Sequence, residues 1–299
     1  GRLIRRSQSQ NEGDIFWTNY TYLDDSELIA SITQSTGFSL SFSYDAEQRI
    51  TCIQDGEHRS TVLHYDAGKT WVSNGKEAVC YSYDRQGHLV SIDSPSQVRI
   101  RYEYEGNYLS RVIQGTLIWY FRYNNVGDCV WTQSPEGECV ERIFNSNHQI
   151  LQENYSYLFK ESQSPKKHVS QYYIYDPHGH LRFQIDKAGV VTELRYNEDG
   201  LCQSRRVFLA HHFLTKETRV TLDQLESWTE SQPLGQVALK EYRYDWRGQL
   251  LEEIVYQRIN SSGEGEKQSA ISTYFQYDAR KRLLAQTKYQ EGKELAQHY

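Results

Sequence analysis

Carboxylates and histidines gather between residues 176 and 186, where their types and spacing could support acid–base chemistry. Asp176 and Asp186 are two carboxylates, and His178 and His180 lie two residues apart between them. A carboxylate pair acts as acid and base only when the surroundings separate the two pKa values. Histidines two residues apart share one side of a strand, but no carboxylate or cysteine completes a metal-ligand set at a recognisable spacing. We therefore interpret both histidines as exposed turn residues.

Other nucleophile and ligand candidates give no stronger signal. His211 and His212 are adjacent, and we interpret them in the same way. The five cysteines are odd in number and include no C-x-x-C pair, which favours scattered free thiols over a disulfide framework or a zinc ribbon. A G-x-S-x-G elbow, an H-E-x-x-H helix and a P-loop are all missing from the sequence. We expect no enzymatic activity, no cofactor and no metal.

Tryptophans are the candidates for ligand binding. Aromatic rings exposed on a sheet stack against sugar rings, and Trp71, Trp119, Trp131 and Trp246 are the candidate platform. The alternative is that each ring packs against a neighbouring strand, which is the commoner role of an aromatic side chain in a sheet. A concave surface with several of these rings facing the same way would favour binding.

The element that must position these residues is a hairpin, and its clearest copy is YIYDPHGHLRFQI, residues 173–185. Tyr173 and Tyr175 are two apart and share one face of a strand. The residues from Asp176 to Gly179 supply turn chemistry, and apolar residues then alternate as far as Ile185. This pattern predicts two antiparallel strands joined by a tight turn.

The hairpin recurs along the chain. The tyrosine before the turn is found at Tyr44, Tyr65, Tyr83, Tyr104, Tyr123, Tyr175, Tyr196, Tyr244 and Tyr277. The first four differences between these numbers are 21, 18, 21 and 19. A degenerate copy, Phe144–Asn145, lies 21 residues after Tyr123. These spacings indicate about ten repeats and about 20 strands.

Each repeat carries the same turn signature. Asp or Asn follows the tyrosine and can cap the turn, and Gly follows two or three residues later to supply a positive φ. The signature residues are Tyr44, Asp45, Tyr83, Asp84, Gly87, Tyr123, Gly127, Tyr175, Asp176, Gly179, Tyr196, Gly200, Tyr244, Asp245, Gly248, Tyr277 and Asp278. Two copies depart from it, and we assign Arg49 and Lys281 to the glycine position. A second turn, centred on glycines such as Gly56, separates one repeat from the next.

The predicted fold is all-β, with repetitive antiparallel hairpins that form a spiralling sheet or partial β-shell. Residues 1–36 form leading strands at 15–23 and 27–33, and residues 37–299 form the repeat array. Residues 215–233 interrupt the array with a short helix near 222–230, because its apolar residues have helical spacing and Thr221 with Gln224 forms a capping box. Residues 162–167 and 261–267 are predicted loop insertions.

Composition limits the partners. The net charge is −6 over 299 residues, so we expect no nucleic-acid partner. No stretch approaches the roughly 18 apolar residues of a membrane span. The mean hydropathy of −0.76 is low and 24 residues are tyrosine, so much of the buried surface must come from rings whose hydroxyls need partners. The sequence contains no methionine and ends within a repeat, so we expect a fragment of a larger protein.

The Y-x-Y-D-x-x-G-x-L units, about 20 residues apart, resemble the Rhs or YD-repeat family of large bacterial proteins. That family includes the cocoon-forming subunits of Tc toxins, and teneurins carry more distantly related repeats. The resemblance covers residue 37 to the C-terminus. It implies a structural wall segment of a shell that encapsulates a C-terminal toxin or effector domain. The implied partners are the rest of the parent chain and the encapsulated toxin domain, and the implied location is secreted or cell-surface.

Two functional alternatives follow from the same resemblance. Rhs-type proteins often have a self-cleaving aspartyl site, and the nearest match here is Asp176, Pro177 and Asp186. It lies mid-chain within a repeat, and Lys187 stands where that pattern has a proline, so we interpret it as structural. The other alternative is an extracellular carbohydrate- or receptor-binding adhesion module, which would use the four tryptophans and bind surface glycans.

Overall fold

The computed structural model describes residues 2–11, 14–157, 166–213, 219–278, 282–290 and 293–298. These residues form two compact units, Gly1–Arg122 and Tyr123–Tyr299. The boundary predicted at residue 36 marks where the repeats begin and stays a prediction. Residues 162–165 of one predicted loop, residues 215–218 of the insert and Lys281 lie outside the described residues.

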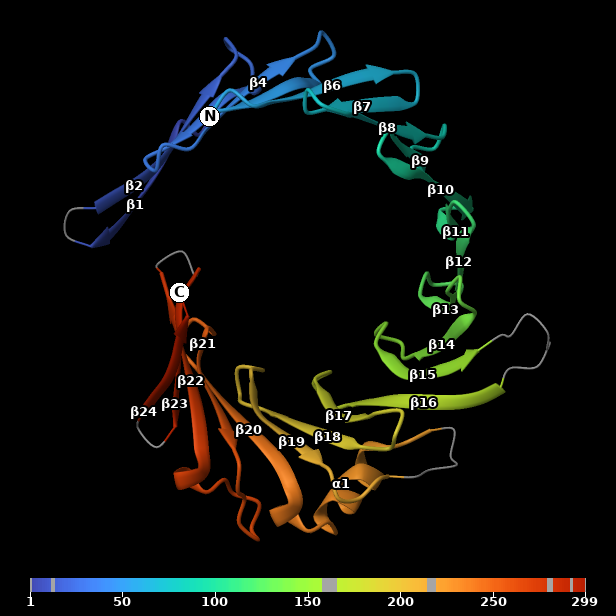
Figure 1. Ribbon diagram of the computed structural model, residues 1–299, viewed down its shortest axis with the longest axis vertical. Helices are drawn as coiled ribbons and strands as arrows, with labels where there is room; N and C mark the ends of the chain where they lie inside the picture. The colour runs from blue at the N-terminus through green and yellow to red at the C-terminus, as the bar shows by residue number, and fades with distance from the viewer. Residues whose placement is uncertain are drawn as a thin grey trace. The chain divides into compact units, whose positions relative to one another are not determined.

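Unit 1 is a meander in which each strand pairs antiparallel with the next (Figure 1). Its strands are β1 (Arg5–Asn11), β2 (Asp14–Tyr22), β3 (Ile29–Gln34), β4 (Ser39–Tyr44), β5 (Ile50–Asp55), β6 (Ser60–Asp66), β7 (Lys69–Ser73), β8 (Ala78–Tyr83), β9 (Leu89–Ser94), β10 (Gln97–Glu105), β11 (Tyr108–Gln114) and β12 (Leu117–Tyr123). The last residue of β12 is the first residue of unit 2.

Unit 2 continues the pattern and adds helices. Its strands are β13 (Cys129–Gln133), β14 (Glu138–Phe144), β15 (Ile150–Tyr157), β16 (Lys166–Tyr175), β17 (Leu181–Ile185), β18 (Val191–Tyr196), β19 (Cys202–Phe208), β20 (Val237–Tyr244), β21 (Leu250–Tyr256), β22 (Ala270–Tyr277), β23 (Leu283–Gln290) and β24 (Lys293–His298). The α-helix α1 (Leu222–Glu230) lies between β19 and β20, and two short 3-10 helices, η1 (Leu234–Gln236) and η2 (Lys267–Ser269), follow. Because β19 and β20 still pair directly, the insert leaves the meander uninterrupted.

The all-β prediction and the helix at 222–230 are confirmed. The side chain of Thr221 accepts a hydrogen bond from the N–H of Gln224, and the Gln224 side chain bonds back to the N–H of Thr221, so the predicted capping box is present. The described residues contain 24 strands: β2 and β3 match the two predicted leading strands, and the 21 strands from β4 to β24 agree with the prediction of about 20 for the repeats. One missed strand is β1, whose polar sequence RRSQSQN gives no apolar alternation; pairing with β2 makes it a strand.

Repeat turns share a five-residue geometry, which Asp84 illustrates. The N–H of Asp84 donates to the carbonyl of His88 at 3.0 Å, and the carboxylate accepts from the N–H groups of Gln86 and His88 at 2.8 and 2.9 Å. The fourth residue, Gly87, has φ +87°. Glycine reaches this left-handed conformation without a steric cost, which explains why it recurs in the signature.

The turn conformations correct two sequence assignments. In the first copy the left-handed residue is Gln48, with φ +64°, so Arg49 occupies the position after it and does not replace the glycine. The second kind of turn has its positive φ at the predicted glycine in three copies, Gly75, Gly137 and Gly189, but in the first copy His58 and not Gly56 has the positive φ, +62°. The degenerate copy keeps the geometry, with the Asn145 side chain as cap and His148 at φ +60°.

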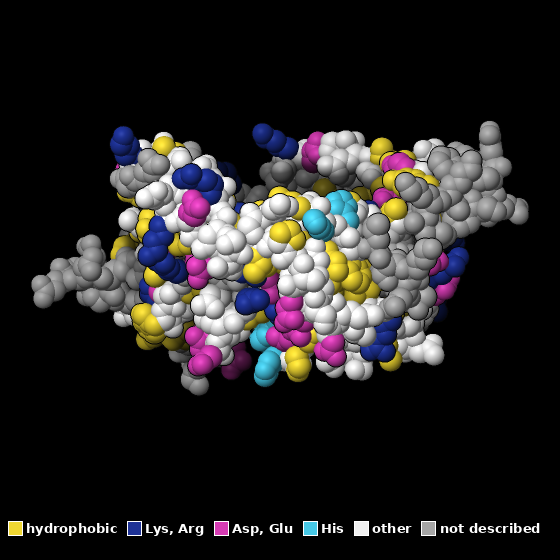
Figure 2. All heavy atoms as spheres, turned by 90° about the horizontal axis from the view of Figure 1, so that it is seen from below, with side chains coloured by type: hydrophobic (Ala, Val, Ile, Leu, Met, Phe, Trp, Pro, Cys, Tyr) yellow, Lys and Arg dark blue, Asp and Glu magenta, His cyan; other side chains and the backbone are white. Residues whose placement is uncertain are grey.

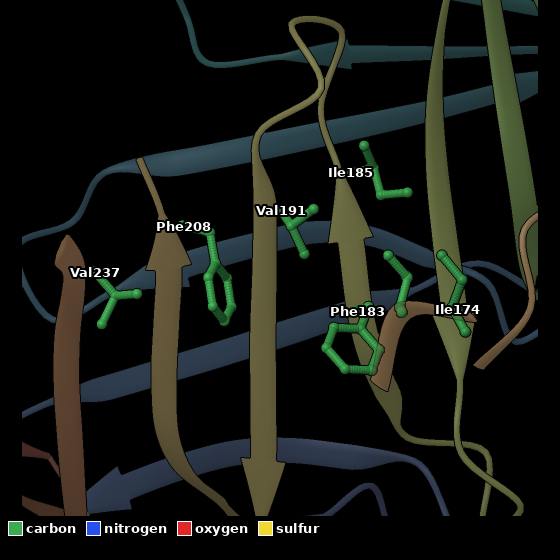
Figure 3. Packing of buried hydrophobic residues seen from close by; sticks show 7 residues of the cluster. Ile174, Phe183, Ile185, Val191, Phe208 and Val237 are labelled. Carbon is green, nitrogen blue, oxygen red and sulfur yellow. The ribbon is translucent and has the colours of Figure 1, made fainter. Parts of the chain in front are cut away.

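Unit 2 has a dry core on one face of its sheet. Ile174, Phe183, Ile185, Val191, Phe208 and Val237 come from five neighbouring strands and point into one layer (Figure 3). Leu225 of α1 completes this layer and is fully buried. Elsewhere burial is mostly partial, and on the face shown in Figure 2 small hydrophobic groups alternate with charged and polar side chains. The helix therefore covers the apolar part of the sheet.

Candidate functional site

The repeat tyrosines tie neighbouring hairpins together through their hydroxyl groups. Tyr196 donates to the carbonyl of Leu181 at 2.9 Å, and Leu181 is the fifth residue after the cap residue Asp176. The equivalent bonds join Tyr44 to Ile29, Tyr65 to Ile50, Tyr104 to Leu89, Tyr175 to Ile150 and Tyr244 to Cys202. Each carbonyl belongs to the first residue of the preceding strand. Six of the 24 tyrosine hydroxyls are thus satisfied by the backbone of the preceding strand.

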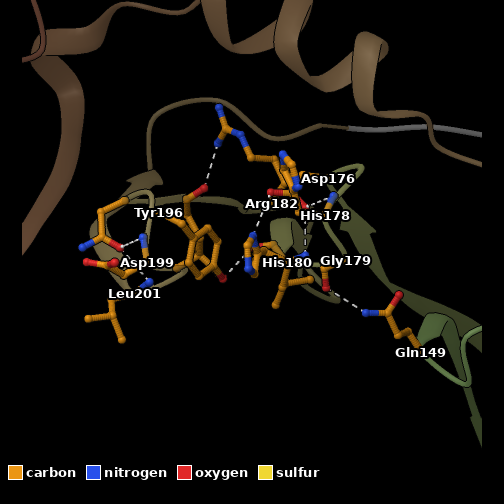
Figure 4. Close-up of polar contacts among 12 residues, drawn as sticks. Gln149, Asp176, His178, Gly179, His180, Arg182, Tyr196, Asp199 and Leu201 are labelled. Atoms are coloured by element: carbon orange, nitrogen blue, oxygen red, sulfur yellow. Dashed lines mark hydrogen bonds and ion pairs between the residues drawn. The ribbon is translucent and has the colours of Figure 1, made fainter. Parts of the chain in front are cut away.

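The side chain that follows the left-handed residue completes the link between repeats. His180 Nδ1 lies 3.2 Å from the carboxylate of Asp176, and its ring stacks on Tyr196 with the ring centres 4.8 Å apart (Figure 4). His88 stacks in the same way on Tyr104, at 4.6 Å. The guanidinium of Arg49 takes the place of the imidazole and lies 4.5 Å from the centre of the Tyr65 ring.

In unit 2 the turns also contact one another directly. His148 Nδ1 lies 2.6 Å from the carboxylate of Asp128, which joins two successive turns. Gln149 donates to the carbonyl of Gly179 at 2.8 Å and joins the next two (Figure 4). We call the capped turns of each unit, together with their tyrosine ties, the turn ladder.

The two candidate catalytic carboxylates cap different turns. Asp176 accepts from the N–H groups of His178 and His180, and Asp186 accepts from those of Ala188 and Val190. They lie at opposite ends of β17, whose five residues separate them by roughly 17 Å. The structure therefore does not bring them together as an acid–base pair.

Hydrogen bonding lowers the pKa of the turn carboxylates. Burial by itself would raise the pKa of Asp176, but the N–H and ring of His180 and the N–H of His178 outweigh it, and the pKa is lowered. At Asp84 burial is likewise outweighed by the N–H and ring of His88. At Asp45 the N–H of Arg49 is the largest cause of the lowered pKa. These groups are held as carboxylates, which suits a cap.

The predicted histidines separate into two kinds. His178, His211 and His212 are exposed, as expected. His180 differs from an exposed turn residue, because it is held between Asp176 and Tyr196. Among the residues that the structure describes, no group of three or more His, Cys, Asp and Glu side chains is placed to hold a metal ion.

All five cysteines are free, as predicted.

A buried carboxylate with three arginines lies beneath α1. Glu193 is 2% exposed, and its oxygens lie 2.8, 2.9 and 3.1 Å from the guanidinium nitrogens of Arg182, Arg195 and Arg206. Burial opposes ionisation, but the arginines outweigh it and lower the pKa of Glu193. The arginines come from β17, β18 and β19, so this cluster locks three strands together.

A second buried carboxylate is satisfied mainly by tyrosines. Glu153 accepts from the hydroxyls of Tyr155 and Tyr173 at 2.8 and 2.9 Å and from Arg142 at 2.9 Å. Burial and the bond to Glu153 raise the pKa of Tyr155 to about 12 and raise that of Tyr173 further. Sequence reasoning missed both glutamates; an acidic residue at an inward position of an apolar strand, as in VVTEL, was the available signal.

Two cavities flank α1 and the segment before it. One of about 720 Å³ lies between α1 and the turns of β16–β17 and β18–β19, and its lining includes His178, Arg195, Glu226 and Glu230. Another of about 620 Å³ lies beside residues 219–222 and is bordered by β14, β15 and β16. The first is lined mostly by charged groups and the second mostly by apolar ones.

The four tryptophans do not form one platform within either unit. In unit 1, Trp71 is half-buried on β7 near His64, and Trp119 is half-buried five strands away on β12. In unit 2, Trp131 is half-buried on β13, whereas Trp246 lies in the turn after β20 and is 91% exposed. Five strands correspond to roughly 24 Å, too far for one sugar ring.

Across the described parts of the chain, no helix is long and apolar enough to cross a membrane.

Comparison with known proteins matches this architecture. A family model described as Teneurin YD-shell matches residues 1–162, more than half of the 299 residues. The protein named Probable deoxyribonuclease RhsB of Dickeya dadantii (strain 3937) is 27% identical over 161 residues, which cover 49% of this chain and 11% of that protein.

Solved structures share the fold. The crystal structure of TcdB2-TccC3 without its hypervariable C-terminal region matches with a TM-score of 0.57 and 12% identity, over 98% of this chain and 18% of that one. The crystal structure of TcdB2-TccC3-Cdc42 matches with a TM-score of 0.51 and 12% identity, over 98% and 20%. The chain therefore spans a fifth or less of the length of each of these proteins.

Proposed function

Because the chain belongs to the teneurin YD-shell family, we propose that it is a wall segment of a shell that encloses a toxin or effector domain carried elsewhere in its parent protein. Its partners are the remainder of the parent chain and the enclosed domain. The parent protein acts outside the cell that makes it, as a secreted or cell-surface protein. The chain itself is not an enzyme.

The turn ladder is the observation that carries this proposal. A wall must resist local opening, and within each unit each hairpin is held to the previous one by a strand pairing and, at six repeat tyrosines in all, by a hydroxyl bond to the backbone. The polar groups of the repeated turn residues are occupied in these links, since Asp176 and His180 bond each other and the backbone. Residues committed in this way support a structural role.

Protease protection in the full-length parent protein tests the proposal. We expect the enclosed domain to resist a protease that cuts the same domain when it is expressed alone. A double variant, Asp176→Ala with Tyr196→Phe, should loosen one link and increase the rate at which that domain is cut. Tyr83→Phe is the matched control, because Tyr83 is 38% exposed and its hydroxyl has no bond among the described residues. Equal cutting of the enclosed and free domains would contradict the proposal.

The second candidate is an adhesion module that binds surface glycans, and the exposure of Trp246 is the observation that favours it. The Trp246 ring is 91% exposed, and the contact that the structure gives it is with the guanidinium of Arg247, 5.5 Å from the ring centre, so most of its surface is accessible to a ligand. We expect a glycan array to give a signal that Trp246→Ala abolishes if this candidate is right. Trp119→Ala serves as the comparison, because its ring is half-buried in a strand. No signal with the unmodified chain would exclude glycan binding.

A further inference from the structure

The apolar cavity of about 620 Å³ in unit 2 has the size of a small-molecule site. Its floor is a row of side chains on one sheet face, because Ile143 pairs with Gln152 and Gln152 pairs with Tyr172 in the antiparallel register. Ile174, two residues after Tyr172, shares that face and belongs to the dry core. The cavity is therefore an open side of the hydrophobic core.

The opposite wall comes from the segment that leads into α1. Val220 and Leu222 line the cavity and also pack against the core. Ile143 remains 47% exposed although it stands on the floor of an apolar cavity. Apolar surface left open in this way is poorly hydrated, so an apolar guest gains free energy by covering it.

One charged group at the cavity is free to bind a ligand. Arg219 lines the cavity and is exposed, and it forms no ion pair among the described residues. Asp176 also lines the cavity, but its two carboxylate oxygens are occupied by His178 and His180. The amide of Gln149 is likewise bonded to Gly179. The available chemistry is thus a mainly apolar surface with a single cation, beside the neutral polar groups of Asn147 and Tyr172.

We propose that this cavity binds a small, elongated apolar molecule that carries one anionic head group, with the chemistry of a medium-chain fatty acid. The chain of the ligand covers Ile143, Ile174 and Leu222, and its head group pairs with Arg219. This inference goes beyond the shell function, because a wall segment requires no ligand.

Calorimetric titration of the whole chain with decanoate, below its micelle concentration, tests the site. We expect saturable binding with one ligand per chain. Decanol has the same chain without the charge and should bind about tenfold more weakly, since a hydrogen bond to a charged group contributes about 1.5 kcal/mol or more. Arg219→Gln should weaken the binding of decanoate by a similar factor and leave the affinity for decanol unchanged. Arg85→Gln, which removes an exposed arginine without an ion pair in unit 1, should change neither.

Filling the cavity is the second arm of the experiment. Ile143→Trp places a large ring on the floor at an exposed position and should remove saturable binding. Leu117→Trp is the matched control, because Leu117 is 43% exposed on a strand of unit 1. Circular dichroism confirms that each variant is folded. The proposal is overturned if the unmodified chain shows no saturable binding, if Ile143→Trp binds as the unmodified chain does, or if decanol binds as tightly as decanoate.

Discussion

The two units are built from the same repeats but are stabilised differently. In the described residues of unit 1, Ile113 is the one buried hydrophobic side chain, whereas those of unit 2 include eleven. Both units have the capped turn and the tyrosine tie, as Asp84 with Tyr104 and Asp176 with Tyr196 show. The comparison shows that strand pairing, capped turns and tyrosine ties are enough to form a repeat. The hydrophobic core is an additional feature, which is found where α1 covers the sheet.

The largest effect that separates the units is expected from the core. Phe183→Ala should lower the free energy of unfolding by about 3 to 5 kcal/mol, because Phe183 is fully buried and its removal leaves a cavity. Phe42→Ala in unit 1 should lower the free energy of unfolding by less than Phe183→Ala does, since Phe42 is only half-buried. Urea denaturation followed by hydrogen exchange of each unit measures both. Equal losses would show that unit 1 has a core of comparable strength.

The buried ion cluster provides the next comparison. Glu193→Gln should destabilise unit 2 by about 3 kcal/mol, because it leaves guanidinium groups buried without their counter-charge. Glu103→Gln in unit 1 breaks an ion pair with Arg111 whose side chains are more than a third exposed, and it should cost less than about 1 kcal/mol. Thermal denaturation of the two variants checks this difference. A small effect of Glu193→Gln would mean that the arginines find other partners.

A smaller loss is expected from one tyrosine tie in either unit. Tyr196→Phe and Tyr104→Phe each remove a hydroxyl donor to a backbone carbonyl and should cost about 1 kcal/mol. Tyr83→Phe should be neutral, because the carbonyl 15 residues back, that of Gly68, accepts from the backbone N–H of Tyr83 at 2.7 Å, and the Tyr83 hydroxyl has no bond among the described residues. Urea midpoints measure all three. If Tyr83→Phe destabilises as much as Tyr196→Phe, the loss is not due to the tie.

The smallest expected effect is a pH dependence that distinguishes Asp-capped from Asn-capped turns. The pKa of Asp176 is lowered in the folded chain, so its contribution to stability is complete above the unfolded pKa, near 3.8, and is lost as the pH falls through the folded pKa. Asp176→Asn should therefore flatten the acid limb of the stability curve. Asn197→Asp, which introduces a carboxylate into the next turn, should steepen it. The free energy of unfolding, measured at pH values from 5 to about 2, tests both variants. If the stability curves of the variants run parallel to that of the unmodified chain, the lowered pKa of the capping carboxylate is not the cause of the acid limb.

The sequence predicted the repeat because its information is local. Alternation of side chains along a strand and the chemistry of Asp, Asn and Gly in turns act over a few residues, so the hairpins, the capping box of α1 and the Rhs/YD-repeat family follow from the order of residues. The errors arose where the local signal was weak. The polar strand β1 has no apolar alternation, and Gln48 occupies a left-handed position without being glycine.

The candidate site depended on contacts that no local pattern encodes. Asp176, Asp186 and His180 were identified from their types, but the strand β17 between the two carboxylates decided that they act separately. The ring of His180 found its partner in Tyr196, one repeat later. The cavity with Arg219 was not predicted, because the segment that begins at Arg219 lies at least 40 residues from the strands and turns that form the other walls.

The sequence by itself thus determined the repeating hairpin, the chemistry of each turn and the place of the helix. Tertiary structure alone decided which carbonyl each tyrosine reaches, which is 15 residues back for Tyr196 but 42 for Tyr244 across the helical insert. It also decided that Glu193 is surrounded by arginines from three strands. The physical reason is that register and burial depend on strands that are neighbours in space, whereas turn geometry depends on residues that are neighbours in the chain.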